Sequence, residues 1–214
     1  MGGILLKLAM IADDLTGAND SGVQLARYGI NTSVLFSHEE KALKEHQAIV
    51  IDTDSRSLGE TEAYNRVKEA SEFLKKETFD VIYKKVDSTL RGNIGSEINA
   101  MYDSFKPDLV IIAPAYPKNN RITKDGYHYL DQQLVSETEI GRDPKTPVRE
   151  SYIPSLLEEQ TRKKVALITH TELSNGEQYV LNKIEEKMTE GIHYIVVDAV
   201  QEQDLKQIVE TVSK

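Results

Sequence analysis

Acidic, hydroxyl and arginine side chains gather at four points of the sequence, each directly after a short apolar run. The four segments are residues 12–17, 52–57, 87–93 and 114–121. Three of them join carboxylates to hydroxyls, and three include an arginine. Carboxylates and hydroxyls share hydrogen bonds with a polyol, and arginine binds a carboxylate or a phosphate through two parallel hydrogen bonds. The segments therefore indicate a small ligand that carries hydroxyl groups and an acidic group.

The third segment runs into a predicted helix that opens at residues 92–95, Gly-Asn-Ile-Gly. The free amides and the positive dipole end of a helix start can hold an anion, here beside Arg91. Helix capping is the alternative for the aspartates, because Asp14 and Asp87 each precede a predicted helix. Capping alone does not require Arg56 or Arg91, which favours ligand binding for the segments as a set.

Short apolar runs rich in isoleucine and valine predict buried strands at residues 5–12, 32–36, 48–52, 79–85, 109–113, 165–169 and 194–198. Helical spacing predicts helices at residues 17–28, 60–77, 93–105, 176–190 and 203–212. Alternating strands and helices form parallel βαβ units, and continuously apolar strands have both sheet faces covered. We therefore predict an α/β fold with an open, mostly parallel, doubly wound sheet. Ligands bind beyond the carboxyl ends of such strands, so the four polar segments should converge on one crevice.

Residues 114–154 break this alternation, because they hold all but one of the six prolines and show little apolar periodicity. A long irregular stretch inside a domain is usually functional or a subdomain. We predict an irregular insertion around residues 114–150, with an excursion or hairpin at residues 127–135.

Composition limits the partners that the chain can have. A net charge of −9 argues against nucleic acid as the main partner, because phosphate binding needs a basic stripe. The absence of cysteine excludes disulfides, thiolate metal sites and thiol catalysis. The apolar run at residues 4–12 contains Lys7, is too short to span a membrane and lacks the features of a signal peptide. We expect no membrane association and a cytoplasmic location.

No familiar nucleotide-binding motif occurs in the sequence. Gly17 and Gly22 have the spacing of a phosphate-binding loop, but Val23 and Gln24 stand where lysine and serine or threonine are required. No Gly-x-Gly-x-x-Gly run is present, and the five histidines show no metal-ligand or triad spacing. We therefore expect no metal site in this chain.

Several motifs, taken together and in this order, resemble the four-carbon acid sugar kinase family. They are residues 11–18 (Ile-Ala-Asp-Asp-Leu-Thr-Gly-Ala), 52–56 (Asp-Thr-Asp-Ser-Arg), 84–93 (Lys-Lys-Val-Asp-Ser-Thr-Leu-Arg-Gly-Asn), 113–117 and 143–148. The resemblance covers most of residues 8–155. It implies a two-domain enzyme in which an N-terminal domain binds the sugar acid and a C-terminal domain binds ATP. The phosphoryl group passes, with Mg²⁺, to the terminal hydroxyl of threonate, erythronate or an oxo-tetronate.

The resemblance also implies roles for particular residues. Asp13 and Asp14 are the expected catalytic residues, with Asp14 preferred as the group that accepts or orients the hydroxyl proton. The expected substrate-binding residues are Asp13, Asp14, Arg56, Lys85, Asp87, Ser88, Arg91 and Gly92. Residues 1–214 correspond to the N-terminal sugar-acid-binding domain, and we expect the nucleotide-binding domain to lie outside this chain.

Two other functions stay open at this point. A stand-alone module that binds a small acid without catalysis would use the same residues. A Mg²⁺-dependent phosphatase would use Asp52 and Asp54, although such a pair is expected after the first strand rather than an interior one.

Solvation at the strand end is the alternative to ligand contact for Lys85. The sequence names neither the acid nor its stereochemistry, and it leaves a homodimer open.

Overall fold

The computed structural model describes residues 6–213 of the chain, which divide into two compact units. The first unit contains the chain up to Asp87 together with residues 96–106. The second unit contains residues 88–95 and the chain from Pro107 onward. Leu5, where the first predicted strand begins, lies outside the described residues.

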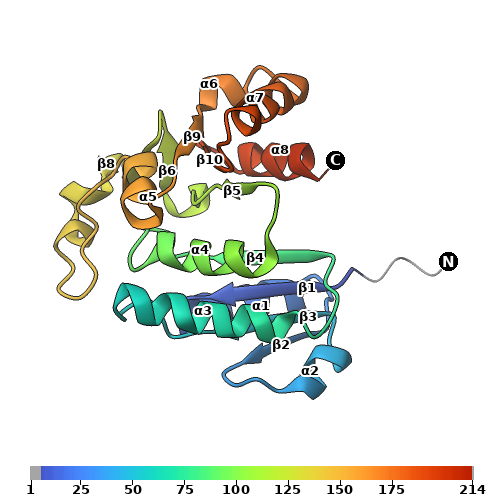
Figure 1. The fold of residues 1–214 in the computed structure, drawn as a ribbon. Coiled ribbons are helices and arrows are strands. Elements are labelled where there is room, and N and C mark those ends of the chain that lie inside the picture. The colour runs from blue at the N-terminus through green and yellow to red at the C-terminus, as the bar shows by residue number, and fades with distance from the viewer. Residues whose placement is uncertain (1–5, 214) are drawn as a thin grey trace. The chain divides into compact units, whose positions relative to one another are not determined.

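The first unit is built on a four-stranded parallel sheet with the order β2-β3-β1-β4 (Figure 1). Four predicted strands form it, with slightly different ends. The strands are β1 (Leu8–Ala12), β2 (Thr32–Leu35), β3 (Ala48–Asp52) and β4 (Val81–Lys85). The helices are α1 (Leu15–Arg27), α2 (Glu40–Glu45), α3 (Glu60–Leu74) and α4 (Ile94–Phe105).

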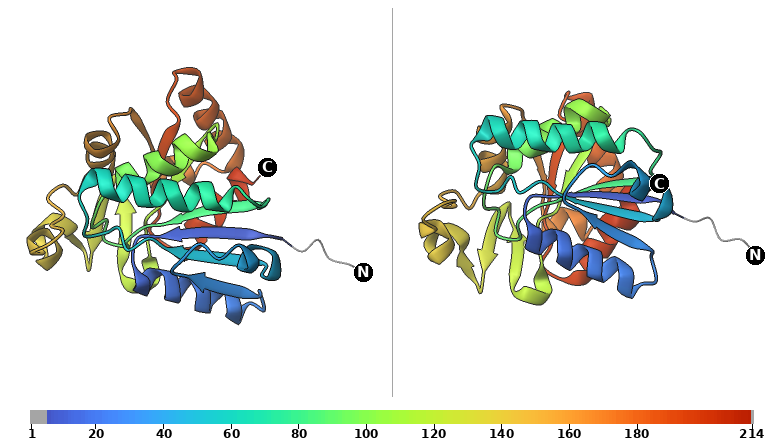
Figure 2. Two further views of the ribbon diagram at one scale, coloured as in Figure 1. Left: turned by 60° about the horizontal axis from the view of Figure 1, so that its bottom comes forward. Right: turned by 90° about the horizontal axis from the view of Figure 1, so that it is seen from below.

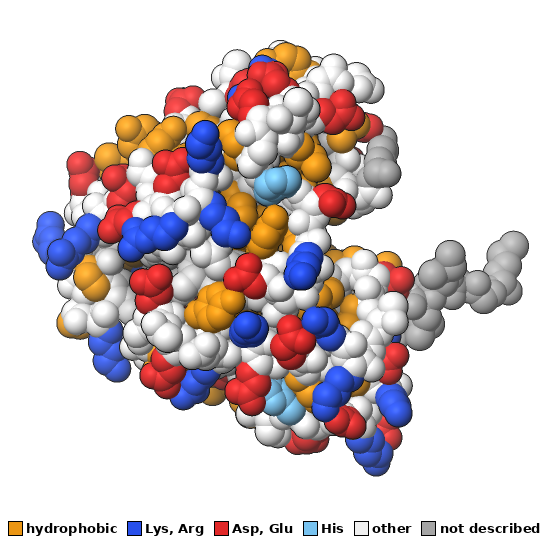
Figure 3. Space-filling model, in the orientation of Figure 1, with side chains coloured by type: hydrophobic (Ala, Val, Ile, Leu, Met, Phe, Trp, Pro, Cys, Tyr) orange, Lys and Arg blue, Asp and Glu red, His pale blue; other side chains and the backbone are white. Residues whose placement is uncertain are grey.

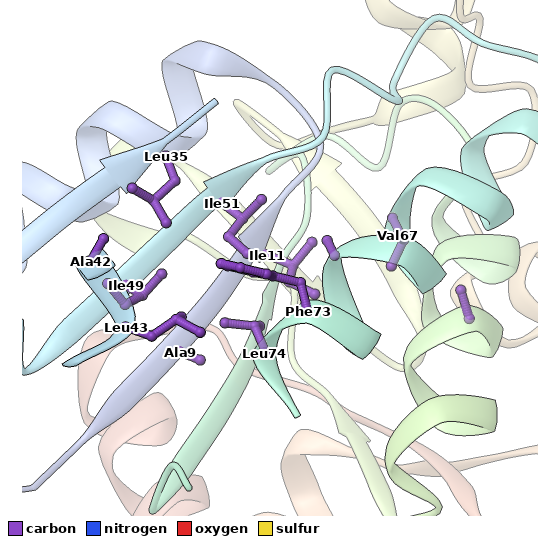
Figure 4. Packing of buried hydrophobic residues seen from close by; sticks show 12 residues of the cluster. Ala9, Ile11, Leu35, Ala42, Leu43, Ile49, Ile51, Val67, Phe73 and Leu74 are labelled. Carbon is purple, nitrogen blue, oxygen red and sulfur yellow. The ribbon is translucent and has the colours of Figure 1, made fainter. Parts of the chain in front are cut away.

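Alternate residues of the central strands pack against opposite layers of helix. Ala9 and Ile11 of β1 lie in one buried cluster with Leu74 of α3, as Figure 4 shows. Met10 lies in a separate cluster with Ala18 of α1. The helices α1 and α3 accordingly cover opposite faces of this sheet (Figure 2). Burial on both faces explains why the central strands are continuously apolar rather than alternating.

This topology places at the carboxyl end of β1 the kind of strand-order position where open α/β sheets bind ligands. The neighbouring strands β3 and β4 are followed by α3 and α4, which contribute to the core cluster on the face opposite α1. A crevice opens where connections leave adjacent strands toward opposite faces. Ala12 is level with Asp52 of β3 and with Lys85 of β4. Register therefore places the residues after these three strands side by side.

The second unit contains a three-stranded parallel sheet with the order β5-β10-β9. Its strands are β5 (Val110–Ile112), β9 (Val165–Ile168) and β10 (Tyr194–Val197), and its helices are α5 (Ile153–Thr161), α6 (His170–Leu173), α7 (Glu177–Thr189) and α8 (Glu202–Val212). The predicted α/β fold class is confirmed. The parallel strands belong to two sheets, however, where the pattern alone predicted one.

The irregular segment forms an antiparallel sheet with the order β6-β7-β8. Its strands are β6 (Arg121–Lys124), β7 (Tyr127–Leu130) and β8 (Gln133–Leu134), and single 3-10 turns lie at Pro117–Asn119, Val135–Glu137 and Glu139–Arg142. Both hairpin turns have two successive residues with positive φ, as the right-handed twist of paired strands favours. The predicted hairpin is confirmed and extended by β6. Among the described residues, no helix has both the length and the apolar character to cross a membrane.

Candidate functional site

Arg56 holds two aspartates together at the carboxyl end of β1. Its Nε donates to Asp13 Oδ2 at 2.7 Å and its Nη2 to Asp13 Oδ1 at 3.1 Å, a two-pronged contact. Its Nη1 donates to Asp14 Oδ2 at 2.7 Å, and Nη2 lies 3.5 Å from Asp87 Oδ1. One guanidinium thus binds the carboxylates that follow β1 and contacts the carboxylate that follows β4.

Backbone hydrogen bonds explain why Arg56 reaches this position. The amides of Ser55 and Arg56 both donate to the carbonyl oxygen of Asp13, at 2.9 and 3.2 Å. Asp54 adopts a left-handed conformation with φ 44°, and its amide donates to Asp52 Oδ1. The loop after β3 is therefore a closed turn that lies against the end of β1. The Asp52 carboxylate, which the alternative phosphatase hypothesis would use, helps to close this turn, and burial raises its pKa.

Asp14 has two roles in the structure. Its Oδ1 accepts from the Gly17 amide at 2.9 Å and so caps the start of α1. Its Oδ2 accepts from Arg56. The capping interpretation was therefore correct, but it does not exclude the second role. The Asp14 side chain is 23% exposed, whereas that of Asp13 is 3% exposed, so Asp14 is the more accessible carboxylate.

Lys85 contributes a second cation to this cluster. Its Nζ donates to the Val86 carbonyl at 2.6 Å. The three nearby carboxylates favour its charged form, whereas the Arg56 charge disfavours it. Burial lowers the pKa of Lys85, and the three carboxylates oppose this effect only in part. Burial also disfavours the charge on Arg56, but its bonds to Asp13 and the nearby carboxylates outweigh that effect and raise its pKa.

The lowered pKa of Lys85 predicts a pH effect on stability. Between its folded pKa and the ordinary value of 10.5, the unfolded chain binds more protons than the folded chain, so stability rises with pH in this window. The unfolding free energy of the wild type minus that of Lys85→Met should therefore increase as pH approaches 10.5. Urea unfolding at stepped pH measures it, and the exposed Lys41→Met is the control. Parallel curves for wild type and Lys85→Met would contradict the prediction.

Ion pairs elsewhere on the molecule are of a different kind. Figure 3 shows acidic and basic side chains interspersed over one face, and pairs such as Lys41–Glu45 and Lys206–Glu210 join exposed residues one helical turn apart. Such surface pairs contribute about 0–1 kcal/mol. The Arg56 side chain is only 17% exposed, so removing this guanidinium leaves the buried Asp13 carboxylate without it, which costs about 3–5 kcal/mol.

Ser88, Arg91 and Gly92 lie in the second unit, in the loop that continues from Asp87. Ser88 Oγ accepts from Arg121 Nη1 at 2.7 Å, and Arg91 Nη1 lies 3.6 Å from Asp143 Oδ2. The fourth polar segment, which ends at Arg121, therefore meets the third one at Ser88. Arg121 was not among the predicted site residues. Its position in the fourth polar segment was the sequence signal that could have identified it.

The start of α4 differs from the expectation of free helix amides. The Gly95 amide donates to Gln160 Oε1 at 2.7 Å, and Gln160 Nε2 donates to the Gly92 carbonyl at 3.3 Å. Gln160 belongs to α5, far away in the sequence, so no local pattern indicated this contact. At least one amide of the predicted anion position is therefore already bonded. Gly92 itself has φ 91°, a conformation that favours glycine.

The sequence matches a known protein family and several named relatives. Residues 8–214 match the protein family described as "Sugar-binding N-terminal domain". A D-erythronate kinase of Heliobacterium modesticaldum is 36% identical over 205 residues, which are 94% of this chain and 47% of that kinase. A D-threonate kinase of Salmonella typhimurium is 37% identical over 204 residues, which are 95% of this chain and 48% of that kinase.

A solved structure shares the fold. It is a domain of unknown function from Bordetella bronchiseptica, a domain-swapped dimer with bound citrate. The TM-score is 0.81 at 29% identity, over 96% of this chain and 50% of that chain. The present chain spans about half the length of the curated relatives that it matches.

Proposed function

Because the chain belongs to the family of sugar-binding N-terminal domains, we propose that it binds the sugar acid in an ATP-dependent four-carbon acid sugar kinase. The acid is of the threonate, erythronate or 3-oxo-tetronate type, and its terminal hydroxyl receives the phosphoryl group. The observation that carries the proposal is the cluster of Asp13, Asp14, Asp87 and Arg56 at the carboxyl edge of the first sheet. Relatives named as erythronate and threonate kinases support the choice of substrate.

Formal charge indicates which part of the acid this cluster suits. Three carboxylates and the two cations Arg56 and Lys85 leave one negative charge in excess. The carboxylate of the acid is repelled there, whereas its hydroxyl groups donate hydrogen bonds to Asp oxygens. We assign Asp13, Asp14 and Asp87 to hydroxyl groups of the acid. The assignment of Arg91 to its carboxylate, with Ser88 and Gly92 as further contacts, rests on the family resemblance.

Asp14 is the proposed acceptor of the proton from the reacting hydroxyl. It is the more exposed of the pair, and both of its oxygens are held, one by the Gly17 amide and one by Arg56. A carboxylate fixed in this way is preorganised for hydrogen bonding to a ligand hydroxyl. Phosphoryl transfer depends mainly on such positioning and on charge stabilisation. Asp13 would orient Arg56, since two of its contacts are to that guanidinium.

We propose that ATP and Mg²⁺ are bound mainly by the part of the longer relatives that this chain does not cover. Bound Mg²⁺ would neutralise charge on the phosphates. Within residues 6–213, no group of three or more His, Asp or Glu side chains is arranged to hold a metal ion. We therefore assign no step to a metal held by this chain. We also place the enzyme in the cytoplasm, where ATP is available. The domain-swapped dimer of the Bordetella protein supports a homodimer for this protein.

Replacing Arg91 by alanine tests the proposal. Loss of a charged hydrogen bond should weaken threonate or erythronate binding by about 1.5–3 kcal/mol in calorimetry. Arg149→Ala, at an exposed position of the same unit, is the control and should leave binding unchanged. A thermal-shift screen of four-carbon acids comes first, because an acid at 100 times its Kd stabilises by about 2.7 kcal/mol. Unchanged acid binding by Arg91→Ala would remove Arg91 from the proposed site. Absence of acid binding by the wild type would reject the proposed substrate class.

Gly17→Ala tests the position of the Asp14 carboxylate. The added Cβ would lie 2.8 Å from Asp14 Oδ1, so that side chain must shift. The helix itself gains, since alanine is favoured over glycine in a helix by roughly 1 kcal/mol. We expect weaker acid binding with little loss of stability, measured by calorimetry and urea unfolding. Gly59→Ala is the control, because its Cβ would meet nothing within 4 Å. Full binding by Gly17→Ala would show that the acid does not need this carboxylate position.

A further inference from the structure

A buried polar network lies beneath the Arg56 cluster in the first unit. Thr53 Oγ1 is 2.8 Å from Ser55 Oγ, and Ser55 Oγ donates to Glu97 Oε1 at 2.8 Å. Glu97 Oε2 lies 2.8 Å from Lys84 Nζ. Glu97 is 2% exposed and Lys84 is 9% exposed, so this is a desolvated ion pair. The network links the loop after β3 to the end of β4 through the helix α4.

Counting hydrogens fixes the direction of the network. The Glu97 carboxylate opposite Lys84 accepts, so Ser55 gives its single hydroxyl hydrogen to Glu97. Ser55 Oγ can then only accept from Thr53, whose single hydroxyl hydrogen is shared between Ser55 Oγ and the Ala12 carbonyl, both at 2.8 Å. Hydrogen bonds in such a chain polarise one another in a low-dielectric interior. Removing one hydroxyl therefore weakens the contacts on both of its sides.

The network and the Arg56 cluster share one short stretch of backbone. Ser55 precedes Arg56, and the amides of both donate to the Asp13 carbonyl. Lys84 Nζ also donates to the Lys85 carbonyl at 3.0 Å, which fixes the end of β4 just before Asp87. The network thus anchors the turn that carries Arg56 and the end of β4 that precedes Asp87. Its members are buried beneath the cluster and do not need to touch a ligand.

We infer that Ser55 and Glu97 are positioning residues for the acid site, acting through Arg56. The inference rests on the proposed function, because it assumes that the Asp13–Asp14–Arg56 cluster binds the acid. Loosening the turn at residues 53–56 lets the Arg56 guanidinium move, and the two carboxylates lose their fixed orientation. Ligand affinity then falls although no group that contacts the ligand has been removed.

Ser55→Ala tests this inference with a matched control in the same unit. Ser71 is also fully buried, and its hydroxyl donates to the Val67 carbonyl within α3, away from the network. Both substitutions remove one buried serine hydroxyl. We expect Ser55→Ala to raise the Kd for threonate or erythronate roughly fivefold to tenfold, as loss of one hydrogen bond implies, and Ser71→Ala to leave it unchanged. Thr53→Val, which keeps the side-chain shape, should act in the same direction as Ser55→Ala.

Steady-state kinetics in the longest form of the protein that carries this chain separate positioning from stability. Loss of folded protein lowers kcat and leaves both KM values unchanged. A positioning role raises the KM for the acid and leaves that for ATP unchanged. Equal Kd values for Ser55→Ala, Thr53→Val and Ser71→Ala, with normal acid binding by the wild type, would overturn the inference alone. Absence of acid binding by the wild type would overturn the proposed function and the inference together.

Discussion

Replacing Arg56 by methionine is expected to destabilise the first unit by about 3–5 kcal/mol. Asp13 is 3% exposed and its carboxylate accepts two hydrogen bonds from this guanidinium, and Asp14 and Asp87 also face it. Methionine fills much of the same volume but leaves these carboxylates to repel one another. Urea unfolding measures the loss, and acid binding should fall with it because the carboxylates change position.

Arg27→Met is the matched control for Arg56→Met. Arg27 is an exposed residue in the last turn of α1, so its replacement should change the unfolding free energy by less than about 1 kcal/mol. If the two variants were equally stable, the buried contacts of Arg56 would contribute no more than a surface charge does. The description of the cluster as a desolvated ion-pair network would then be wrong.

Asp14→Asn is expected to have the largest effect on activity. Asparagine keeps an oxygen that can cap α1 through the Gly17 amide, so the fold should be retained. It cannot accept a proton from the reacting hydroxyl. Loss of a general base lowers the rate by about 10²–10⁴-fold, so kcat should fall by this factor while the acid still binds. A coupled ADP-release assay on the longest form of the protein measures kcat.

Two comparisons sharpen the Asp14 experiment. Asp20→Asn, at an exposed position of α1, controls for the loss of a negative charge on the same helix and should keep full activity. Asp13→Asn should act mainly through stability, because Asp13 is buried against Arg56. A larger fall in kcat for Asp13→Asn than for Asp14→Asn, at equal folded fractions, would reverse the proposed roles of the two residues.

The sequence by itself determined the elements and the polar ends of the strands. Runs such as residues 48–51 are apolar throughout because both faces of β3 are covered, and this pattern is local. The carboxylates at Asp13, Asp14 and Asp87 were therefore found as strand-end residues before any contact was known. The family resemblance rested on the same segments, and the matched family confirms it.

Only the tertiary structure decided which side chains meet. Arg56 and Asp13 are 43 residues apart, and Ser55 and Glu97 are 42 residues apart. Their contacts depend on strand order and register, which place β3 and β4 on either side of β1. Apolar periodicity encodes neither strand order nor register. For the same reason, the sequence showed neither the division of parallel strands between two sheets nor the contact of Gln160 with Gly95.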